Sequence, residues 1–224
     1  MASQRTINIY LTFIQIQITI NALDLYSRIW IGQYDHLSFE SRFYVKSGAD
    51  WARVDENEHM RNALFLQIRS ILLPKLNCGL YGSYGIWSSE TDDRAKDAYD
   101  MQQVIRYKQA YYRHPEGGNT VDFGEPMIEG RYPRVVCRMS GKQESPHMRI
   151  YMYPEQFEIY RNAVQIYDHF VEGEYQKLFA FYTDNEKALD LAKECEKYNN
   201  KNTRKRSGLT QFVQKLNIIE ASKV

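Results

Sequence analysis

The sequence predicts an α+β fold in which two similar strand–helix units, residues 6–37 and 148–178, pack against each other with further helices between and after them. The first observation behind this prediction is an internal repeat: residues 9–37 align without a gap to residues 150–178, and ten of the 29 aligned pairs are identical. The second is the helical spacing of apolar residues in several other segments, each with start and stop signals. Because two similar units in one chain favour pseudo-twofold packing, we expect a groove between them.

The identical pairs of the repeat are aromatic, polar, small and aliphatic, so the two copies match in character along their length. They include Ile9 with Ile150, Tyr10 with Tyr151, Asn21 with Asn162, Ala22 with Ala163, Tyr26 with Tyr167, Gly32 with Gly173, Tyr34 with Tyr175 and Leu37 with Leu178. One copy can therefore be used to interpret the other.

Each copy is expected to start with a strand and continue as a helix. Taken alone, residues 14–20 alternate apolar and polar side chains and look like a half-buried strand. The aligned segment of the second copy has Pro154 followed by good helix formers, which favours a helix in both copies. We therefore expect strands at residues 6–11 and 148–153 and helices at residues 13–31 and 154–172.

Both of these helices carry signals for their ends. Thr12, followed by Gln15 three residues later, fits a capping box at the start of the first helix. Gly32 and Gly173 come directly after the last helical residues, where a left-handed residue is expected. Apolar stripes should face a shared core, with Tyr26 and Tyr167 packed beside them: Ile18, Ala22, Leu25 and Ile29, matched by Ile159, Ala163, Ile166 and Phe170.

Further helices are predicted between and after the two copies. Asp55 with Glu58 looks like a capped helix start, and that helix should stop near Pro74. Thr91 and the two aspartates after it should start the next helix, which ends before Pro115. We then expect a strand at residues 134–139, a linker at 141–145, helices at 185–198 and 209–221, and a polar basic segment at 199–208 between the last two.

The charge balance and the cysteines narrow the class of protein. There are 29 basic and 28 acidic side chains, which argues against a protein that mainly neutralises nucleic-acid phosphates. Three cysteines without CxxC spacing are expected to be free thiols in a reducing cytoplasm. The apolar stretch 7–20 is too short and too interrupted for a membrane span or a signal peptide. The chain should form two units, residues 1–140 and 141–224, or one compact domain.

No pattern in the sequence indicates catalysis. None of the five histidines stands at a metal-binding spacing from another, so we expect neither a metal nor a cofactor. The acidic pair Asp92 and Asp93 sits at a helix start, where capping explains it. Cys78 lacks the surroundings of a nucleophile. We therefore expect no catalytic residues and no enzyme activity.

The most distinctive local string is residues 114–126. Its two adjacent glycines permit a tight turn with exposed backbone amides, and the cations before it could close around a phosphate or carboxylate. A plain helix end, with basic side chains facing the helix dipole, explains the same string slightly better. If the string binds a ligand, the residues facing it should be Arg106, Tyr107, Arg113, His114, Gly117 and Gly118.

The repeat adds a second set of candidate ligand-binding residues. Arg28 and Gln33 flank the end of the first helix, and the equivalent positions of the second copy hold His169 and Glu174. Polar groups are thus kept at both places while their identity changes, as expected when one duplicated copy retains a function. We therefore place Arg28 and Gln33 near the ligand.

The basic side chains near the C-terminus have two explanations. Nucleic-acid contact is one, but only one aromatic residue, Tyr198, is interleaved with them, and the rest of the chain has no basic excess. A solvated tail is the explanation we favour. The side chains concerned are Lys197, Lys201, Arg204, Lys205 and Arg206.

Part of the chain resembles a family of small uncharacterised proteins of tailed phages and prophages. The resemblance is carried by residues 22–29 with Gly32-Gln33-Tyr34, and by residues 103–106 leading into the Pro-Glu-Gly-Gly, Val-Asp-Phe and Glu-Pro motifs of residues 115–126. It covers about residues 6–127 and carries no activity that could be transferred. It implies a phage accessory protein made in the cytoplasm of a bacterial host.

These observations lead to one expected function and one alternative. We expect a non-enzymatic counter-defence protein that binds and sequesters a small anionic ligand, a nucleotide immune signal above all. The alternative is a protein-binding inhibitor or adaptor that acts on a host defence protein. Either protein is expected to form a homodimer or a higher homo-oligomer and to have no membrane or nucleic-acid partner.

Overall fold

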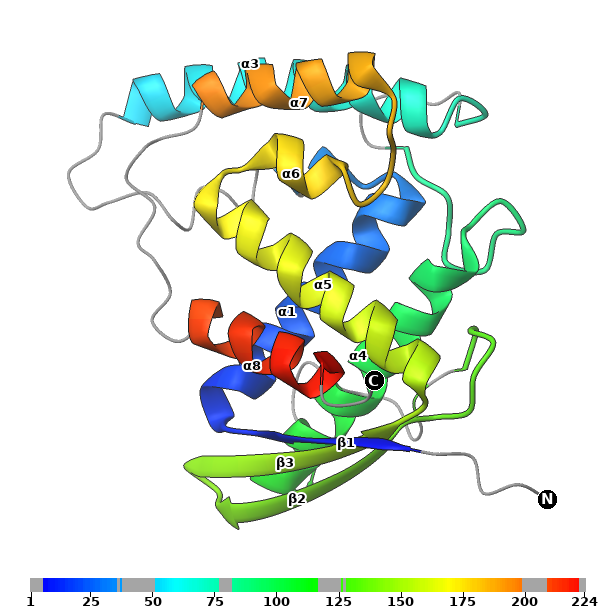
Figure 1. Ribbon diagram of the computed structural model, residues 1–224, viewed down its shortest axis with the longest axis vertical. Coiled ribbons are helices and arrows are strands. Elements are labelled where there is room, and N and C mark those ends of the chain that lie inside the picture. The colour runs from blue at the N-terminus through cyan, green and yellow to red at the C-terminus, as the bar shows by residue number, and fades with distance from the viewer. Residues whose placement is uncertain are drawn as a thin grey trace.

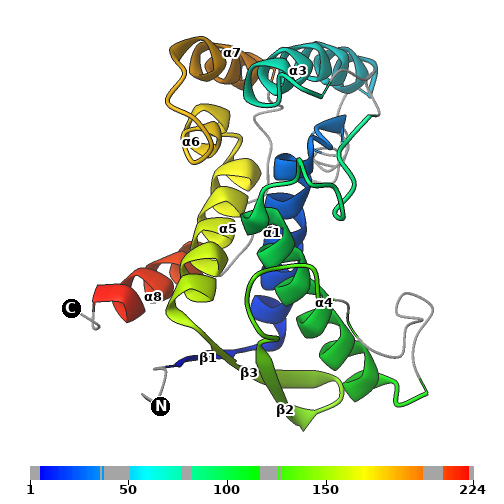
Figure 2. The same cartoon turned by 90° about the vertical axis from the view of Figure 1, so that its right-hand side faces the viewer.

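The protein consists of a small sheet at one end and helices stacked above one face of it (Figure 1). The computed structural model describes residues 6–35, 37, 51–76, 82–116, 126, 128–198 and 209–221. Farthest from the sheet, the helices α3 (Trp51–Leu72) and α7 (Glu186–Lys197) lie side by side across the top of the molecule (Figures 1 and 2). The predicted α+β class is confirmed.

The sheet has three antiparallel strands, β1 (Ile7–Leu11), β2 (Val136–Lys142) and β3 (Ser145–Met152), in the order β1-β3-β2. Strand β3 is central, and Ile9 of β1 lies opposite Ile150 of β3. Burial alternates along the strands, so that Ile9, Ile150 and Cys137 face the helices while the residues between them face away.

Helix α1 (Phe13–Ile31) follows β1, and helix α5 (Pro154–Glu172) follows β3. Both helices have the predicted bounds. In each, the glutamine side chain at the third helical position accepts a hydrogen bond from the backbone N–H of the residue before the helix, at 3.0 Å. Gly32 and Gly173 end them with φ values of 86° and 72°, a left-handed conformation that glycine adopts without the usual steric cost.

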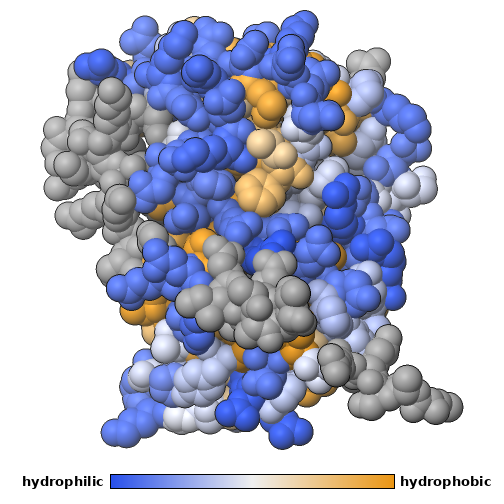
Figure 3. All heavy atoms as spheres, in the orientation of Figure 1, coloured by the Kyte–Doolittle hydropathy of each residue, from blue (hydrophilic) through white to orange (hydrophobic). Residues whose placement is uncertain are grey.

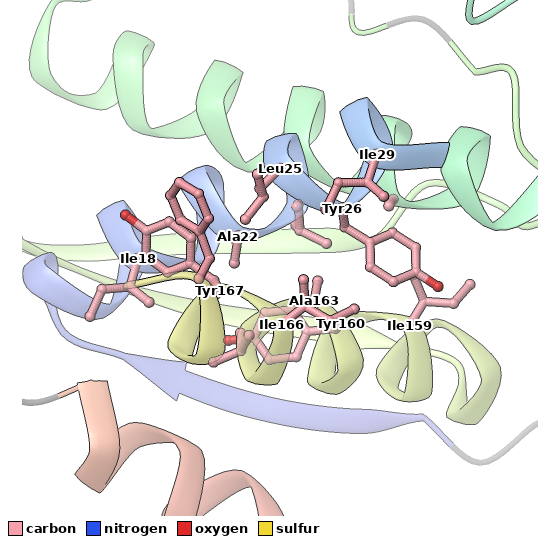
Figure 4. Close-up of a cluster of buried hydrophobic side chains, with 14 of the residues drawn as sticks. Ile18, Ala22, Leu25, Tyr26, Ile29, Ile159, Tyr160, Ala163, Ile166 and Tyr167 are labelled. Carbon is pink, nitrogen blue, oxygen red and sulfur yellow. The ribbon is translucent and has the colours of Figure 1, made fainter. Parts of the chain in front are cut away.

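Helices α1 and α5 pack against each other through their apolar faces (Figure 4). Tyr26 and Tyr167 are buried between them, as predicted. A buried hydrogen bond of 3.0 Å joins the Thr19 and Tyr160 hydroxyls, and Asn21 donates to the Tyr167 hydroxyl at 3.3 Å. The two strand–helix segments therefore share one core, while their origin by duplication stays a prediction.

The other helices are α3 (Trp51–Leu72), α4 (Asp93–Arg113), α6 (Tyr175–Phe179), α7 (Glu186–Lys197) and α8 (Leu209–Ala221). Helix α8 has the predicted bounds, and α7 is capped by Asn185, which accepts from the Ala188 N–H at 3.2 Å. Helix α4 is capped by Asp92, one residue later than predicted. The short helix α6 was not predicted.

Two predictions about boundaries are wrong. Helix α3 begins before Asp55, because Val54 is buried in the core and continues the helix towards the N-terminus. Residues 141–145 are not a linker but the end of a β-hairpin, in which Lys142 lies opposite Ser145 and Gly141 has a φ of 90°. The hairpin depends on pairing between β2 and β3, which local sequence signals do not reveal.

One hydrophobic core cluster includes buried residues from both sides of position 140, and that position lies within β2. Around this core, the face seen in Figure 3 is mostly hydrophilic, with apolar side chains in small separate patches. Within the described ranges, no helix combines the length and the apolar character needed to span a membrane.

Candidate functional site

A pocket of about 300 Å³ lies between the C-terminal end of α1, the segment 82–87 and the first half of α4. We call it the α1–α4 pocket. Helix α1 contributes mainly polar side chains to the lining, and the other two segments contribute three aromatic rings. The lining residues are Asp24, Ser27, Arg28, Ile31, Gln33, Ser83, Tyr84, Gly85, Ile86, Trp87 and Tyr99.

A chain of hydrogen bonds forms the polar wall of the pocket. Arg28 Nε donates to Asp24 Oδ2 at 2.6 Å, and Arg28 Nη1 donates to Gln33 Oε1 at 2.7 Å. Gln33 Nε2 in turn donates to Ser83 Oγ at 3.4 Å. The side chains of Arg28 and Asp24 remain 31% and 40% exposed. A ligand would therefore meet an ordered guanidinium and an ordered carboxylate that are both in contact with solvent.

The aromatic wall of the pocket presents an exposed indole. Trp87 is 65% exposed, and its Nε1 donates to Glu129 Oε1 at 2.9 Å. Burial raises the pKa of Tyr99, Asp100 adds to the rise and Arg106 opposes it, so the phenol stays protonated at neutral pH. The wall thus offers flat rings together with a hydroxyl donor.

The segment that carries Tyr84 and Trp87 is tied to the helices on both sides. Buried Arg69 of α3 donates from Nη1 to the Gly82 carbonyl at 2.8 Å and to the Gly32 carbonyl at 3.4 Å. Thr91 Oγ1, just before α4, donates to the Gly85 carbonyl at 2.8 Å. These bonds hold the pocket wall in place before any ligand arrives, which lowers the entropic cost of binding.

Two buried carboxylates of α4 position Glu129, the hydrogen-bond partner of Trp87. Asp100 accepts from the N–H groups of Glu129 and Gly130, the latter at 2.7 Å, and Asp97 pairs with Arg131 at 2.6 Å. A Cβ on Gly130 would lie 2.4 Å from Asp97 Oδ1. Only glycine allows the loop to approach α4 this closely.

The structure separates the predicted ligand-binding residues into two groups. Arg28 and Gln33 line the α1–α4 pocket. The Arg113 guanidinium instead lies 5.3 Å from the ring of Phe13, at the opposite end of α1. Fifteen residues of helix separate Phe13 from Arg28, which corresponds to about 22 Å. Arg113 therefore does not reach the pocket.

The remaining predicted residues lie along or beyond α4. Arg106 is close enough to Tyr99 to affect its pKa. Tyr107 packs against Tyr111 with ring centroids 4.4 Å apart. His114 ends the helix, and its N–H donates to the Ala110 carbonyl at 2.8 Å. Gly117 and Gly118 lie outside the described residues, as does the basic segment 199–208.

Several residues that line the pocket were not predicted from the sequence, among them Asp24, Tyr84, Trp87 and Tyr99. Trp87 gave the one available signal, because it stands in a Gly- and Ser-rich stretch of the sequence, residues 78–89, and exposed aromatic side chains in such stretches often have a binding role. Asp24 and Tyr99 gave no signal, because only the packing of α1 against α4 brings them to the same place.

A second pocket, of about 200 Å³, lies near the start of α5, and both of its arginines are already engaged. Arg94 pairs with Asp92 at 2.9 Å and lies 4.1 Å from the centre of the Trp30 ring. Arg131 is held by Asp97. Arg28 of the α1–α4 pocket is engaged in the same way, so the pockets differ instead in their rings: only the lining of the α1–α4 pocket includes an exposed tryptophan.

The two described cysteines are buried thiols, and the described acidic side chains do not gather into a metal-binding cluster. Cys137 and Cys195 are free and buried, and burial raises the pKa of each thiol to about 12, so neither is a thiolate at neutral pH. Cys78 lies outside the described residues. Within the part of the chain that the structure describes, no group of three or more His, Cys, Asp or Glu side chains is arranged to hold a metal ion.

Comparisons with protein-family models, with curated proteins and with solved structures give no match to this chain. Function is therefore inferred from the pocket itself.

Proposed function

We propose that the protein binds and sequesters a small nucleotide-like anion in the α1–α4 pocket, without chemical turnover. The observation that carries this proposal is that the exposed Trp87 ring lines the same pocket as the bonded Arg28 and Asp24. We further propose that it acts as a phage accessory protein in counter-defence. The phage setting depends on the resemblance of residues 22–34 and 103–126 alone.

The aromatic wall favours a planar ring as one part of the ligand. Stacking of a base on an aromatic side chain contributes roughly 1–3 kcal/mol, and Trp87 and Tyr99 both offer rings at the pocket. A volume of about 300 Å³ is at the lower end of the range for small-molecule sites. It suits a base with its sugar, while phosphate groups would remain at the open side.

The polar wall favours a negative charge beside that ring. The Arg28 guanidinium has five N–H donors, and its bonds to Asp24 and Gln33 engage two of them. A phosphate oxygen that accepts from the remaining donors would form charge-assisted hydrogen bonds. The Asp24 carboxylate can accept from a base amino group or a sugar hydroxyl, which would select against simple inorganic anions.

Gly85 offers a direct way to block the pocket. A Cβ built on this lining residue meets no atom within 4 Å, so Gly85→Leu would place its side chain in open space without clashing with the protein. Titration calorimetry with cyclic dinucleotides, ADP-ribose derivatives and mononucleotides should then show binding to the wild type and none to the variant.

Two tryptophan variants provide a matched comparison for the same titrations. Trp87→Ala should lose most of the affinity, whereas Trp51→Ala should keep it, because Trp51 is similarly exposed at 57% but lies on α3 outside the pocket. Absence of binding to every ligand, in protein with an unchanged circular dichroism spectrum, would overturn the proposal. So would recovery of the ligand as a chemically altered product, or stoichiometric capture of a host protein that Gly85→Leu does not affect.

We also propose that the two strand–helix segments are copies of one ancestral unit packed about a pseudo-twofold axis. Three contacts support this: Ile9 lies opposite its counterpart Ile150, Thr19 bonds its counterpart Tyr160, and the Arg28–Gln33 bond has an equivalent in His169–Glu174 at 2.8 Å. The double substitution His169→Arg with Glu174→Gln should therefore preserve the thermal midpoint within about 2 °C, since an Arg–Gln pair already fits this geometry and the Glu174–Lys177 ion pair that is lost is exposed and contributes little. A fall of more than about 5 °C would contradict equivalence.

A further inference from the structure

The face of the sheet that points away from the helices is uncovered by any labelled helix in Figures 1 and 2. We call this surface, made of Asn8, Tyr10, Val136, Arg138, Ser140, Lys142, His147, Arg149 and Tyr151, the outer sheet face. Tyr10 is 43% exposed and Val136 is 54% exposed, and both Arg138 and Arg149 are exposed. The solvated face of an antiparallel sheet is commonly polar, and this one combines polar residues with tyrosine rings and arginines.

Aromatic rings stand on both sides of a central arginine on this face. Tyr10 of β1 and His147 of β3 stack with centroids 5.3 Å apart and an interplanar angle of 24°. Tyr151, four residues further along β3, has the Arg138 guanidinium 5.4 Å from its ring centre. His147 and Tyr151 are therefore separated by about 13 Å along the strand, with Arg149 between them.

The charge of the face is positive and uncompensated. Arg138 lies opposite Arg149 in the β2–β3 register, an arrangement that by itself destabilises a sheet. The three strands contain no Asp or Glu, and the nearest acid in sequence is Glu144 in the hairpin turn. Among the described residues, neither arginine has an ion-pair partner. Lys142 extends the positive charge along β2.

We propose that the outer sheet face binds single-stranded nucleic acid. Bases would stack on the Tyr10–His147 pair and on Tyr151, as they do on other antiparallel sheets with outward-facing aromatic residues, while Arg138 and Arg149 contact the phosphates between them. A duplex keeps its bases stacked inside and cannot use the rings. The net charge of the whole chain, +1, conceals this face because the acidic residues lie elsewhere.

This proposal is independent of the α1–α4 pocket, since no residue is shared between the two sites. Fluorescence anisotropy of labelled dT12 and rU12 with the full chain should show binding that weakens as salt rises. Three phosphate contacts, with Arg138, Arg149 and Lys142, predict a slope of about −2 for log K against log salt. The two oligonucleotides show whether DNA or RNA is preferred, and a duplex of the same length should bind more weakly than either.

The variants are chosen to separate stacking from charge. Tyr10→Ala, and independently Tyr151→Ala, should weaken binding by about five- to 150-fold. Arg149→Gln should weaken binding and reduce the steepness of the salt slope by about 0.7. Trp51→Ala and Lys75→Gln remove an exposed ring and an exposed cation at other places, and both should bind like the wild type, as should Gly85→Leu.

Several results would overturn the assignment. Absence of binding to both single strands, or equal binding of duplex, would exclude a stacking surface. If Trp51→Ala or Lys75→Gln weakened binding of the single strands as much as the variants of the outer sheet face do, binding would be a general property of the surface. If only Gly85→Leu weakened it, the nucleic acid would bind in the α1–α4 pocket instead.

Discussion

The hydrogen bond between Thr19 and Tyr160 is the most direct probe of the contact between α1 and α5. Both groups are fully buried and their hydroxyl oxygens lie 3.0 Å apart. Burial raises the pKa of Tyr160 while the bond from Thr19 lowers it less, so the phenol is neutral at ordinary pH. Tyr160→Phe removes one hydroxyl and leaves the other buried without this partner. Such an unsatisfied group costs about 1–3 kcal/mol of unfolding free energy.

The reverse substitution, Thr19→Val, should cost a similar amount because it leaves the Tyr160 hydroxyl without its partner. The double variant replaces both hydroxyls by apolar groups of nearly the same shape, so its cost should fall below the sum of the two single costs by about 1 kcal/mol. Urea unfolding followed by circular dichroism gives the four free energies, provided that the slopes with denaturant agree.

Tyr111→Phe serves as the control, since Tyr111 is half-buried on α4 and packs its ring against Tyr107. Its unfolding free energy should stay within about 0.5 kcal/mol of the wild type. Additive costs for Thr19→Val and Tyr160→Phe would refute the reasoning, because they would mean that the two hydroxyls do not interact in solution.

Three further predictions concern the helix ends and the thiols. Gly32→Ala and Gly173→Ala should each lower the unfolding free energy by about 1–2 kcal/mol, because both glycines have a left-handed backbone conformation. Gly32→Ala should cost more, since its Cβ would lie 2.5 Å from Leu76 Cδ2. Thermal unfolding measures both losses. Burial alone would raise the pKa of Asp92, but the bonds from the Arg94 side chain and backbone outweigh it and the pKa is lowered. The stability that Asp92 contributes is therefore present above about pH 4 and is lost as the pH falls through the lowered pKa, so acid titration should destabilise the wild type more than Asp92→Asn; equal pH dependence would contradict this. In a Cys78→Ser background, the buried thiols of Cys137 and Cys195 should resist maleimide in the folded protein at pH 8 and react after unfolding in guanidinium, as mass spectrometry would show; rapid labelling of the folded protein would refute their burial.

Local signals were sufficient to predict the two long helices of the core. In α1 and α5, a glutamine at the third position and a glycine after the last turn act within a few residues of the chain, and the observed bounds are those expected. Residues 14–20 alternate like a strand, and the first copy alone would have predicted one there. Comparison with the second copy gave the correct prediction, a helix.

Contacts between distant segments explain what the sequence could not show. The β2–β3 hairpin requires pairing of whole strands, and the early start of α3 depends on burial of Val54. The α1–α4 pocket combines Arg28, which the sequence analysis selected, with Trp87 and Tyr99, which approach it only when α1 packs against α4. Arg113 was selected with the string at residues 114–126 and Arg28 from the repeat, and the antiparallel packing of α4 against α1 places the two at opposite ends of α1.

The net charge of the whole chain does not describe the charge of the outer sheet face. A total of +1 predicts no nucleic-acid partner only if the charges are mixed evenly over the surface. The strands contain arginines and no carboxylates, so their outer face differs from the average surface. Strand alternation combined with the pairing register would have been needed to find it.

The central claim, that the α1–α4 pocket holds a nucleotide-like ligand beside Trp87, is tested most directly by the indole N–H signals in a ¹⁵N correlation spectrum. The chain has three tryptophans, and substitution of each assigns its signal. Addition of the cyclic dinucleotide, ADP-ribose derivative or mononucleotide that binds most tightly in calorimetry should move the Trp87 signal, because its ring lines the pocket. The Trp51 signal should stay unchanged. A Trp87 signal that stays fixed at saturating ligand, or a shift confined to Trp51, would contradict the account.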